Sequence, residues 1–170
     1  TGEEIRFEEL LTSVHATSTR GFPGYVLQAE AAQHPEIARL SPTVTNTLRV
    51  VTLVSDEAVH VLSVVMRLGR AGNMTDNWEQ GGLGVPVDPQ TGVMGKAVLK
   101  PKHGGERVAA HPDTGVCFVG ERLPFVAESV ELSRRAALLL PGVRSVGWDV
   151  LITEDGPVLP VRGTDPHDGS

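Results

Sequence analysis

The chain has 170 residues, a formal net charge of −6 at pH 7 and one cysteine, Cys117. This length suits one domain with a hydrophobic core, and the acidic balance argues against a nucleic acid or an anionic membrane surface as a partner. A single cysteine cannot form an intramolecular disulfide, the histidines lack zinc-site spacing, and there is neither an apolar run of about 18 residues nor a signal-peptide start. The composition therefore predicts a soluble, cytoplasmic protein.

An amphipathic helix and a short strand are predicted before residue 30. The apolar face of this helix comprises Phe7, Leu10, Leu11 and Val14. The strand is GYVLQ (24–28), and short helical stretches interrupted at His34-Pro35 follow it. Because the chain begins at Thr1, without methionine, and enters the helical pattern at once, we expect it to be part of a longer protein.

An arginine interrupts each of the next two predicted strands. These β-branched strands are 46–54 and 58–70. A three-residue loop, 56–58, would place Val65 opposite Arg49. The same register would place Thr47 opposite Arg67, so both arginines would lie on one face, whereas a two-residue loop would put them on opposite faces. On one face they would form a binding site for phosphate or carboxylate oxygens; the simpler interpretation is that each reaches solvent or a surface acid.

Residues 71–124 are rich in glycine and proline, which predicts loops with one strand near 93–99. The stretch DNWEQGG (76–82) is predicted to be a solvated loop, although its glycines would let backbone N–H groups approach an anion. The stretch HPDTG is predicted to be a turn with Asx-type hydrogen bonds. The alternative for this turn is that His111 and Asp113 serve as acid and base.

Residues 125–140 form the clearest predicted helix, which Pro141-Gly142 ends. Its predicted stripe of core-facing residues comprises Val126, Val130, Ala137 and Leu138. Hairpins combined with helices, without an internal repeat, predict an α+β fold.

The last predicted hairpin carries one acid, Asp149, in its first apolar strand. A three-residue loop, Glu154-Asp155-Gly156, would set Asp149 opposite Val161, with Gly163 further along the same face. A two-residue loop, Asp155-Gly156, would instead set Asp149 opposite Arg162. In that second register an ion pair would satisfy the carboxylate.

Seven stretches resemble, in order, the motifs of the ATP-grasp superfamily: GYVLQ, QHPEIARLSP, TNTLRVVT, VVMRLGR, DNWEQGG, HPDTG and VGWDVLITEDGP. The resemblance spans residues 24–159 and is strongest to the sugar-transfer-associated ATP-grasp group, with a looser likeness to α-glutamate ligases. It implies the C-terminal lobe of that fold, an antiparallel sheet with flanking helices, and hence a single partial domain over residues 1–170. Enzymes of this superfamily bind ATP between two α+β lobes and activate a carboxylate as an acylphosphate, which an amine or thiol attacks.

The resemblance also implies a set of site residues. The implied cofactor-binding residues are Gln28 near the adenine, Glu30 near the ribose, and Gly81 and Gly82 in the loop that closes over the reacting groups. The implied catalytic residues are Arg49, Arg67 and Asn77. Asp149 is the implied first Mg²⁺ ligand, which would hold the β- and γ-phosphates of ATP through the metal.

Two departures from the family's pattern bear on catalysis. The remaining metal ligands of the family, a Glu-x-Asn sequence in the second strand, fall on Val161 and Gly163, and neither side chain can bind Mg²⁺. The family's phosphate-binding lysines precede the adenine-contacting segment, whereas the first lysine here is Lys96. We therefore expect the N-terminal lobe to be absent from this chain, and its binding of ATP and Mg²⁺ to be weak or lost.

The sequence leaves two functions open. The first is ATP binding within a carboxylate–amine or carboxylate–thiol ligase that is incomplete or inactive as this fragment. Its partners would be a small-molecule or peptide carboxylate and the missing N-terminal lobe. The second is a degenerate ATP-grasp module that serves binding or assembly without catalysis. A longer natural chain with a lysine-bearing lobe would favour the first function, and a genuine start near Thr1 would favour the second.

Overall fold

A computed structural model describes residues 32–70, 81–99 and 105–160, together with residues 6, 8, 9 and 12. The chain divides into two compact units: Ala31–Val161 forms one, and Thr1–Glu30 with Arg162–Ser170 forms the other. The strands and helices named below belong to the first unit. The predicted strand 24–28 and the apolar face of the predicted N-terminal helix lie outside the described residues, although residues 8, 9 and 12 are helical.

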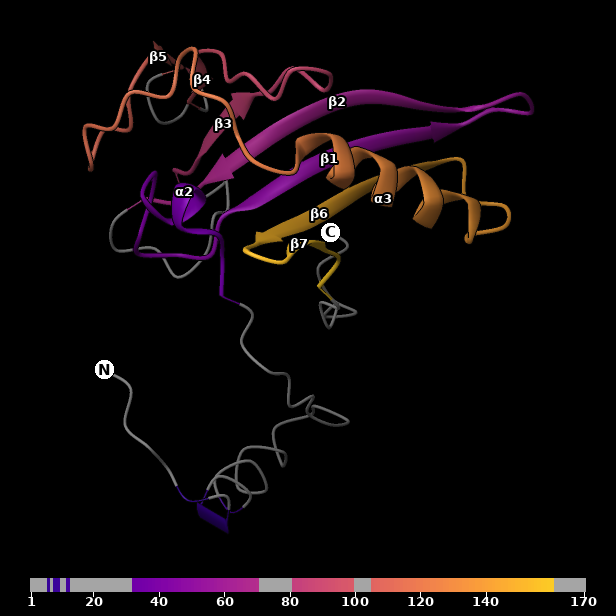
Figure 1. Ribbon diagram of the computed structural model, residues 1–170, viewed down its shortest axis with the longest axis horizontal. Helices are drawn as coiled ribbons and strands as arrows, with labels where there is room; N and C mark the ends of the chain where they lie inside the picture. The colour runs from indigo at the N-terminus through magenta and orange to yellow at the C-terminus, as the bar shows by residue number, and fades with distance from the viewer. Residues whose placement is uncertain are drawn as a thin grey trace. The chain divides into compact units, whose positions relative to one another are not determined.

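The first unit is built on an antiparallel sheet of seven strands in the order β5-β4-β3-β2-β1-β6-β7 (Figure 1). The strands are β1 (Thr47–Val54), β2 (Val59–Leu68), β3 (Leu83–Pro86), β4 (Ala97–Val98), β5 (Arg107–Val108), β6 (Ser145–Thr153) and β7 (Gly156–Val158). The helices are α2 (Pro35–Ala38) and α3 (Val126–Leu138). This arrangement confirms the predicted α+β class. Neither helix, in the part of the chain that the structure describes, is long and apolar enough to span a membrane.

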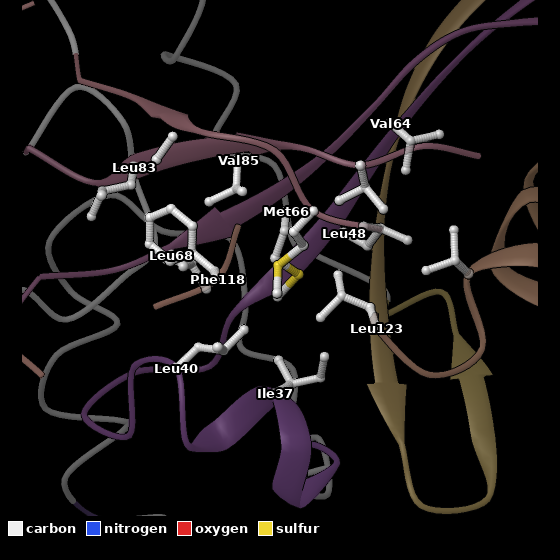
Figure 2. Packing of buried hydrophobic residues seen from close by; sticks show 14 of the residues in the cluster. Ile37, Leu40, Leu48, Val64, Met66, Leu68, Leu83, Val85, Phe118 and Leu123 are labelled. Carbon is white, nitrogen blue, oxygen red and sulfur yellow. The ribbon is translucent and has the colours of Figure 1, made fainter. Parts of the chain in front are cut away.

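One face of the sheet holds the hydrophobic core, and we call it the core face. Leu48 and Val50 of β1 and Met66 of β2 are almost completely buried on this face. Ile37 of α2 and Val126 of α3 belong to the same cluster, and Figure 2 shows Ile37, Leu48 and Met66 packed close together. Helix α3 lies across β1, β2 and β6 (Figure 1). The two helices therefore pack on the core face.

The opposite face carries the charged residues predicted for the site, and we call it the arginine face. Its central residues are Arg49, Val51, Val65, Arg67 and Asp149, all of which are half-buried. They come from the three adjacent strands β2, β1 and β6. Because side chains alternate along each strand, the sheet register decides which residues meet there.

The loop between β1 and β2 differs from the prediction. Val54 pairs with Val59, and the chain reverses between them, where Ser55 N donates to Ala58 O at 2.9 Å. The predicted three-residue loop is therefore wrong. Continued without interruption, this register would put the two arginines of the hairpin on opposite faces of the sheet.

A β-bulge restores the predicted alignment. The ladder passes from Thr52↔Val61 to Val51↔Ser63, so Leu62 is an extra residue without an opposite partner. One extra residue shifts the register by one position, and Arg49 consequently lies opposite Val65. Arg67 likewise lies opposite Thr47. The predicted pairing of both arginines is confirmed, although two compensating features produce it instead of the loop alone.

Both predicted registers of the last hairpin are wrong. Thr153 pairs with Gly156 and Leu151 with Val158, so the turn is Glu154-Asp155. Gly156 has a φ of +122°, a conformation that only glycine adopts readily. It is the first residue of β7, whereas both predictions placed it in the loop. If the ladder continued in this register, residue 160 would lie opposite Asp149. The predicted partners, Val161 or Arg162, and also Gly163, lie outside the described residues.

The predicted loop-rich segment contains more strand than expected. Strand β4 lies within the predicted strand near 93–99, but β3 and β5 were not predicted. Strand β3 contains Gly84 and Pro86, which disfavour a strand when only the sequence is considered. Pairing with β2 through Leu68↔Leu83 and Met66↔Val85 imposes the extended structure.

Helix α3 is confirmed, but its buried stripe differs from the prediction. The buried residues are Val126, Ser129, Ser133 and Ala137. Leu138, predicted to face the core, is 67% exposed. The hydroxyl of Ser129 donates to the carbonyl of Phe125 at 2.6 Å, and that of Ser133 donates to the carbonyl of Ser129 at 2.8 Å. Because these hydroxyls are satisfied within the helix, serine can occupy the core-facing positions.

Candidate functional site

Arg49, Arg67 and Asp149 meet on the arginine face. Arg49 lies directly opposite Asp149 in the β1–β6 ladder. Its Nε donates to Asp149 Oδ1 at 2.6 Å and its Nη2 donates to Oδ2 at 3.1 Å, so the guanidinium binds the carboxylate in a bidentate manner. Arg67 Nη1 donates to the same carboxylate, at 3.1 Å from Oδ1 and 3.3 Å from Oδ2. The prediction that both arginines lie on one face of the sheet is confirmed, and both side chains bind Asp149 there.

Arg67 reaches Asp149 from two strands away. It lies on β2, with β1 between it and β6, and neighbouring strands are about 5 Å apart. Only a long side chain spans that distance. The residue of β1 opposite Arg67 is Thr47, whose short side chain leaves room for the crossing. Three strands therefore contribute one charged side chain each to a single cluster.

The cluster is partly buried, and its three charged groups alone sum to a positive charge. The side chains of Arg67 and Asp149 are 16% and 17% exposed, and that of Arg49 is 37% exposed. A guanidinium group stays protonated in a protein, so two arginines and one carboxylate sum to a charge of about +1 at neutral pH. This charge, with planar N–H donors at the surface, suits an oxyanion such as a phosphate or a carboxylate.

The described residues do not fit a magnesium site. They contain no group of three or more His, Cys, Asp or Glu residues that could hold a metal ion. Both oxygens of Asp149, the predicted first ligand, accept hydrogen bonds from guanidinium groups. Mg²⁺ requires several oxygen ligands in near-octahedral geometry. The metal role of Asp149 stays a prediction, and we assign no step to a metal.

The other predicted site residues are placed only in part. Gly81 and Gly82 are buried directly before β3, whose Leu83 pairs with Leu68 at the end of β2. They therefore lie beyond the end of β2 that carries Arg67. Gly81 has a φ of +96°, which favours glycine at this position. The remaining residues, Gln28, Glu30 and Asn77, lie outside the described residues.

His111 and Asp113 hold a turn in place. His111 is 1% exposed, and its Nε2 lies 2.8 Å from the carbonyl oxygen of Gly69. Its Nδ1 accepts the backbone N–H groups of Asp113 at 3.2 Å and Thr114 at 3.4 Å. These partners fit a neutral imidazole with its proton on Nε2. The turn interpretation of HPDTG is confirmed, and the histidine ring accepts two of the backbone N–H groups of the turn.

Asp113 pairs with Arg70. The Nε of Arg70 donates to Asp113 Oδ2 at 2.8 Å, and this hydrogen bond is the main reason that the pKa of Arg70 is raised. Arg70 lies three residues after Arg67 in the sequence. The pair therefore joins the turn at 111–115 to the chain just beyond β2.

A buried polar network at the end of β2 was not predicted. The Asn46 side chain is completely buried; its Nδ2 donates to Ser41 O at 2.8 Å, and its Oδ1 accepts from Gly69 N at 3.1 Å. The Ser41 hydroxyl donates to Gly69 O at 3.0 Å. Gly69 follows β2 two residues after Arg67, so the network anchors the strand end that carries this arginine. An asparagine before an apolar strand usually indicates a turn, and the sequence gives no sign of this anchoring role.

The fold and the cluster together define an α+β protein with helices on one face of an antiparallel sheet and two arginines bound to one aspartate on the other. A family model, described as sugar-transfer associated ATP-grasp, matches residues 4–160. The chain therefore belongs to the sugar-transfer-associated ATP-grasp family, as its motifs predicted, and it is an ATP-grasp-type module of a family that binds ATP. Searches of curated proteins and of solved structures found no match to the chain.

Proposed function

We propose that this module binds ATP on its arginine face and works within a carboxylate–amine or carboxylate–thiol ligase. Membership of the ATP-grasp family supports nucleotide binding. The observation that carries the proposal is the convergence of Arg49 and Arg67 on one carboxylate. Guanidinium groups bind phosphate and carboxylate oxygens through paired hydrogen bonds, and these are the groups that meet in such a reaction.

In the proposed reaction a substrate carboxylate oxygen attacks the γ-phosphorus of ATP, and ADP leaves. The resulting acylphosphate is then attacked at its carbonyl carbon by an amine or thiol, and inorganic phosphate leaves. Arg49 and Arg67 would neutralise the phosphoryl and carboxylate oxygens without exchanging protons, because both stay charged. Asp149 would hold the two guanidinium groups in position before the substrates bind.

The proposal also covers the nucleotide's other contacts. Gln28 and Glu30 would contact the adenine and ribose, and Asn77 with Gly81 and Gly82 would approach the reacting groups. The family's phosphate-binding lysines have no counterpart before Lys96, so we propose that another lobe supplies them. The partner substrate would be a small-molecule or peptide carboxylate.

A second candidate function is that of a binding module without catalysis. The observation that favours it is the state of Asp149, both of whose oxygens are bound by arginine. The described residues also lack a three-ligand metal group. Metal polarisation of a phosphoryl group stabilises the transition state by several kcal/mol, and a module without it would retain the fold and lose the reaction.

Two measurements test the proposal and separate the two functions. In a titration with MgATP we expect dissociation in the millimolar range, about −4 kcal/mol, since few binding groups are in place. Arg67→Met should weaken this binding, whereas Arg144→Met, at an exposed arginine outside the cluster, should not. Hydroxylamine added with ATP, Mg²⁺ and candidate carboxylates should trap an acylphosphate as a hydroxamate if the chain is a ligase. ATP binding without a hydroxamate would support the second function, and an absence of binding would contradict both.

A further inference from the structure

Gly147 lies beneath the side chain of Arg49. It is on β6, opposite Val51 and two residues before Asp149, so it shares the arginine face. A Cβ atom added to Gly147 would lie 2.8 Å from Arg49 Nη1 and 3.3 Å from Arg49 Cδ. Unbonded heavy atoms of this kind are normally about 3.5 Å or more apart. Any side chain at this position would therefore collide with the arginine.

The backbone of Gly147 does not itself require glycine. Gly147 is not among the positive-φ glycines, and it lies within a regular ladder. In a strand, glycine is less stable than alanine because it loses more conformational freedom on folding and adds no packing. The reason for glycine at this position is the close approach of the Arg49 side chain.

We infer that Gly147 is a positioning residue that lets Arg49 lie flat across β6, with one donor group left for an oxyanion ligand. The hydrogen bonds of Arg49 to described residues use Nε and Nη2, both to Asp149, and Nη1 makes none of them. Nη1 lies over Gly147 on a side chain that is 37% exposed. The ligand part of this inference rests on the proposed function, whereas the positioning part does not.

The end of an arginine side chain moves more easily than a strand. A methyl group at Gly147 should therefore displace the Arg49 guanidinium and leave the sheet intact. Displacement would separate Nε from Asp149 Oδ1, which are 2.6 Å apart. The paired geometry would be lost together with the direction of Nη1.

The first test observes the Arg49 Nε–H group by ¹H–¹⁵N NMR, with its signal identified by its loss in Arg49→Lys. In Gly147→Ala we expect the signal to move toward the position that it takes in Asp149→Ala, which has no side-chain acceptor, because both changes remove the hydrogen bond from Nε to the carboxylate. The matched control is Gly84→Ala on β3, where an added Cβ would meet only Val65 Cγ1, at 3.3 Å. That variant should leave the signal in place. An unmoved signal in Gly147→Ala would overturn the inference.

The second test uses the sign of a stability change. We expect Gly147→Ala to lower the Tm of the parent by about 3 °C and to raise the Tm when Arg49→Ala is already present. Only a clash with the arginine produces this reversal, since alanine otherwise suits a strand better than glycine. An equal loss in both backgrounds would overturn the inference.

The third test measures ligand binding, with sodium pyrophosphate as the probe. The parent and Gly84→Ala should bind it alike, and Gly147→Ala should bind it about tenfold more weakly, as expected for the loss of one charged hydrogen bond. If the parent binds no pyrophosphate while the NMR signal moves as expected, the proposed oxyanion function fails and the positioning role stands. If all three bind equally, the assignment of Nη1 to the ligand is wrong.

Discussion

Replacing Asp149 with asparagine removes the charge that holds two arginines together. The asparagine side chain has nearly the same size but only one acceptor oxygen, and its NH₂ group would face a guanidinium donor. In the parent, Arg49 and Arg67 each donate hydrogen bonds to the Asp149 carboxylate at 2.6–3.3 Å. In the variant they would lose this shared counter-ion. We therefore expect Asp149→Asn to destabilise the fold.

The expected loss lies between the values for buried and exposed ion pairs. Removing one partner of a buried pair costs about 3–5 kcal/mol, and exposed pairs contribute about 0.2–1 kcal/mol. Asp149 and Arg67 are less than one-fifth exposed, but Arg49 is 37% exposed and its contribution is screened by water. An intermediate loss of about 2 kcal/mol follows, which for a chain of this size lowers the Tm by about 6 °C.

The assay is urea and thermal unfolding followed by circular dichroism, with Asp56→Asn as the matched control. Asp56 also pairs with an arginine, Arg144, but at 3.5 Å and with both side chains more than 70% exposed. The control should lose less than about 0.5 kcal/mol. Equal losses in the two variants would refute the reasoning, because the cluster would then be no more than a surface ion pair.

Three further predictions concern residues outside the cluster. His111→Ala should lower the free energy of unfolding in urea by about 3 kcal/mol, because it removes a buried ring and leaves two backbone N–H groups without their acceptor. His111→Asn keeps an acceptor near the Nδ1 position, so its loss should be clearly smaller. The pKa of Asp88 is lowered, first by the backbone N–H of Thr91 and then by the Thr91 hydroxyl. The carboxylate therefore stabilises the fold above the unfolded-state pKa of 3.8. This stabilisation is lost as the pH falls through the lower pKa of the folded state. Melting curves of parent and Asp88→Asn should therefore differ near neutral pH and converge in acid, and a constant difference would contradict the assignment. Ser133→Ala should change the free energy of unfolding by less than about 0.5 kcal/mol. The hydroxyl of Ser133 bonds only to a carbonyl of its own helix in the described residues, and alanine is the better helix former. A loss above about 1 kcal/mol would show that the hydroxyl is needed for packing.

Local pattern predicted β1, β2, β6 and α3 and the shared face of the two arginines, but it missed β3 and β5, and the details of register came from tertiary structure. The β-branched runs of β1 and β2 and the helix α3 were predicted from periodicity and turn residues. The bulge at Leu62 leaves no trace in an apolar sequence, so the correct alignment of Arg49 and Arg67 followed from an incorrect loop. In the last hairpin Gly156 was predicted as a loop residue, whereas its left-handed backbone opens β7.

The candidate site was predicted in its charged members and missed in its supporting residues. A charge within an apolar strand is conspicuous, which is why Asp149 was identified. Gly147 and Asn46 act through a close approach and through buried hydrogen bonds. Both effects depend on neighbours that are distant in the sequence, and neither residue type is conspicuous where it occurs.

The central claim is that ATP binds on the arginine face, and valine methyl NMR tests it most directly. Val51 and Val65 are half-buried on this face, while their chain neighbours Val50 and Val64 are 0% and 4% exposed on the core face. Addition of MgATP to about 10 mM, well above a dissociation constant of about 1 mM, should shift the methyl signals of Val51 and Val65 and leave those of Val50 and Val64 nearly unchanged. No shift on the arginine face at this concentration, or shifts confined to the core-face valines, would contradict the claim.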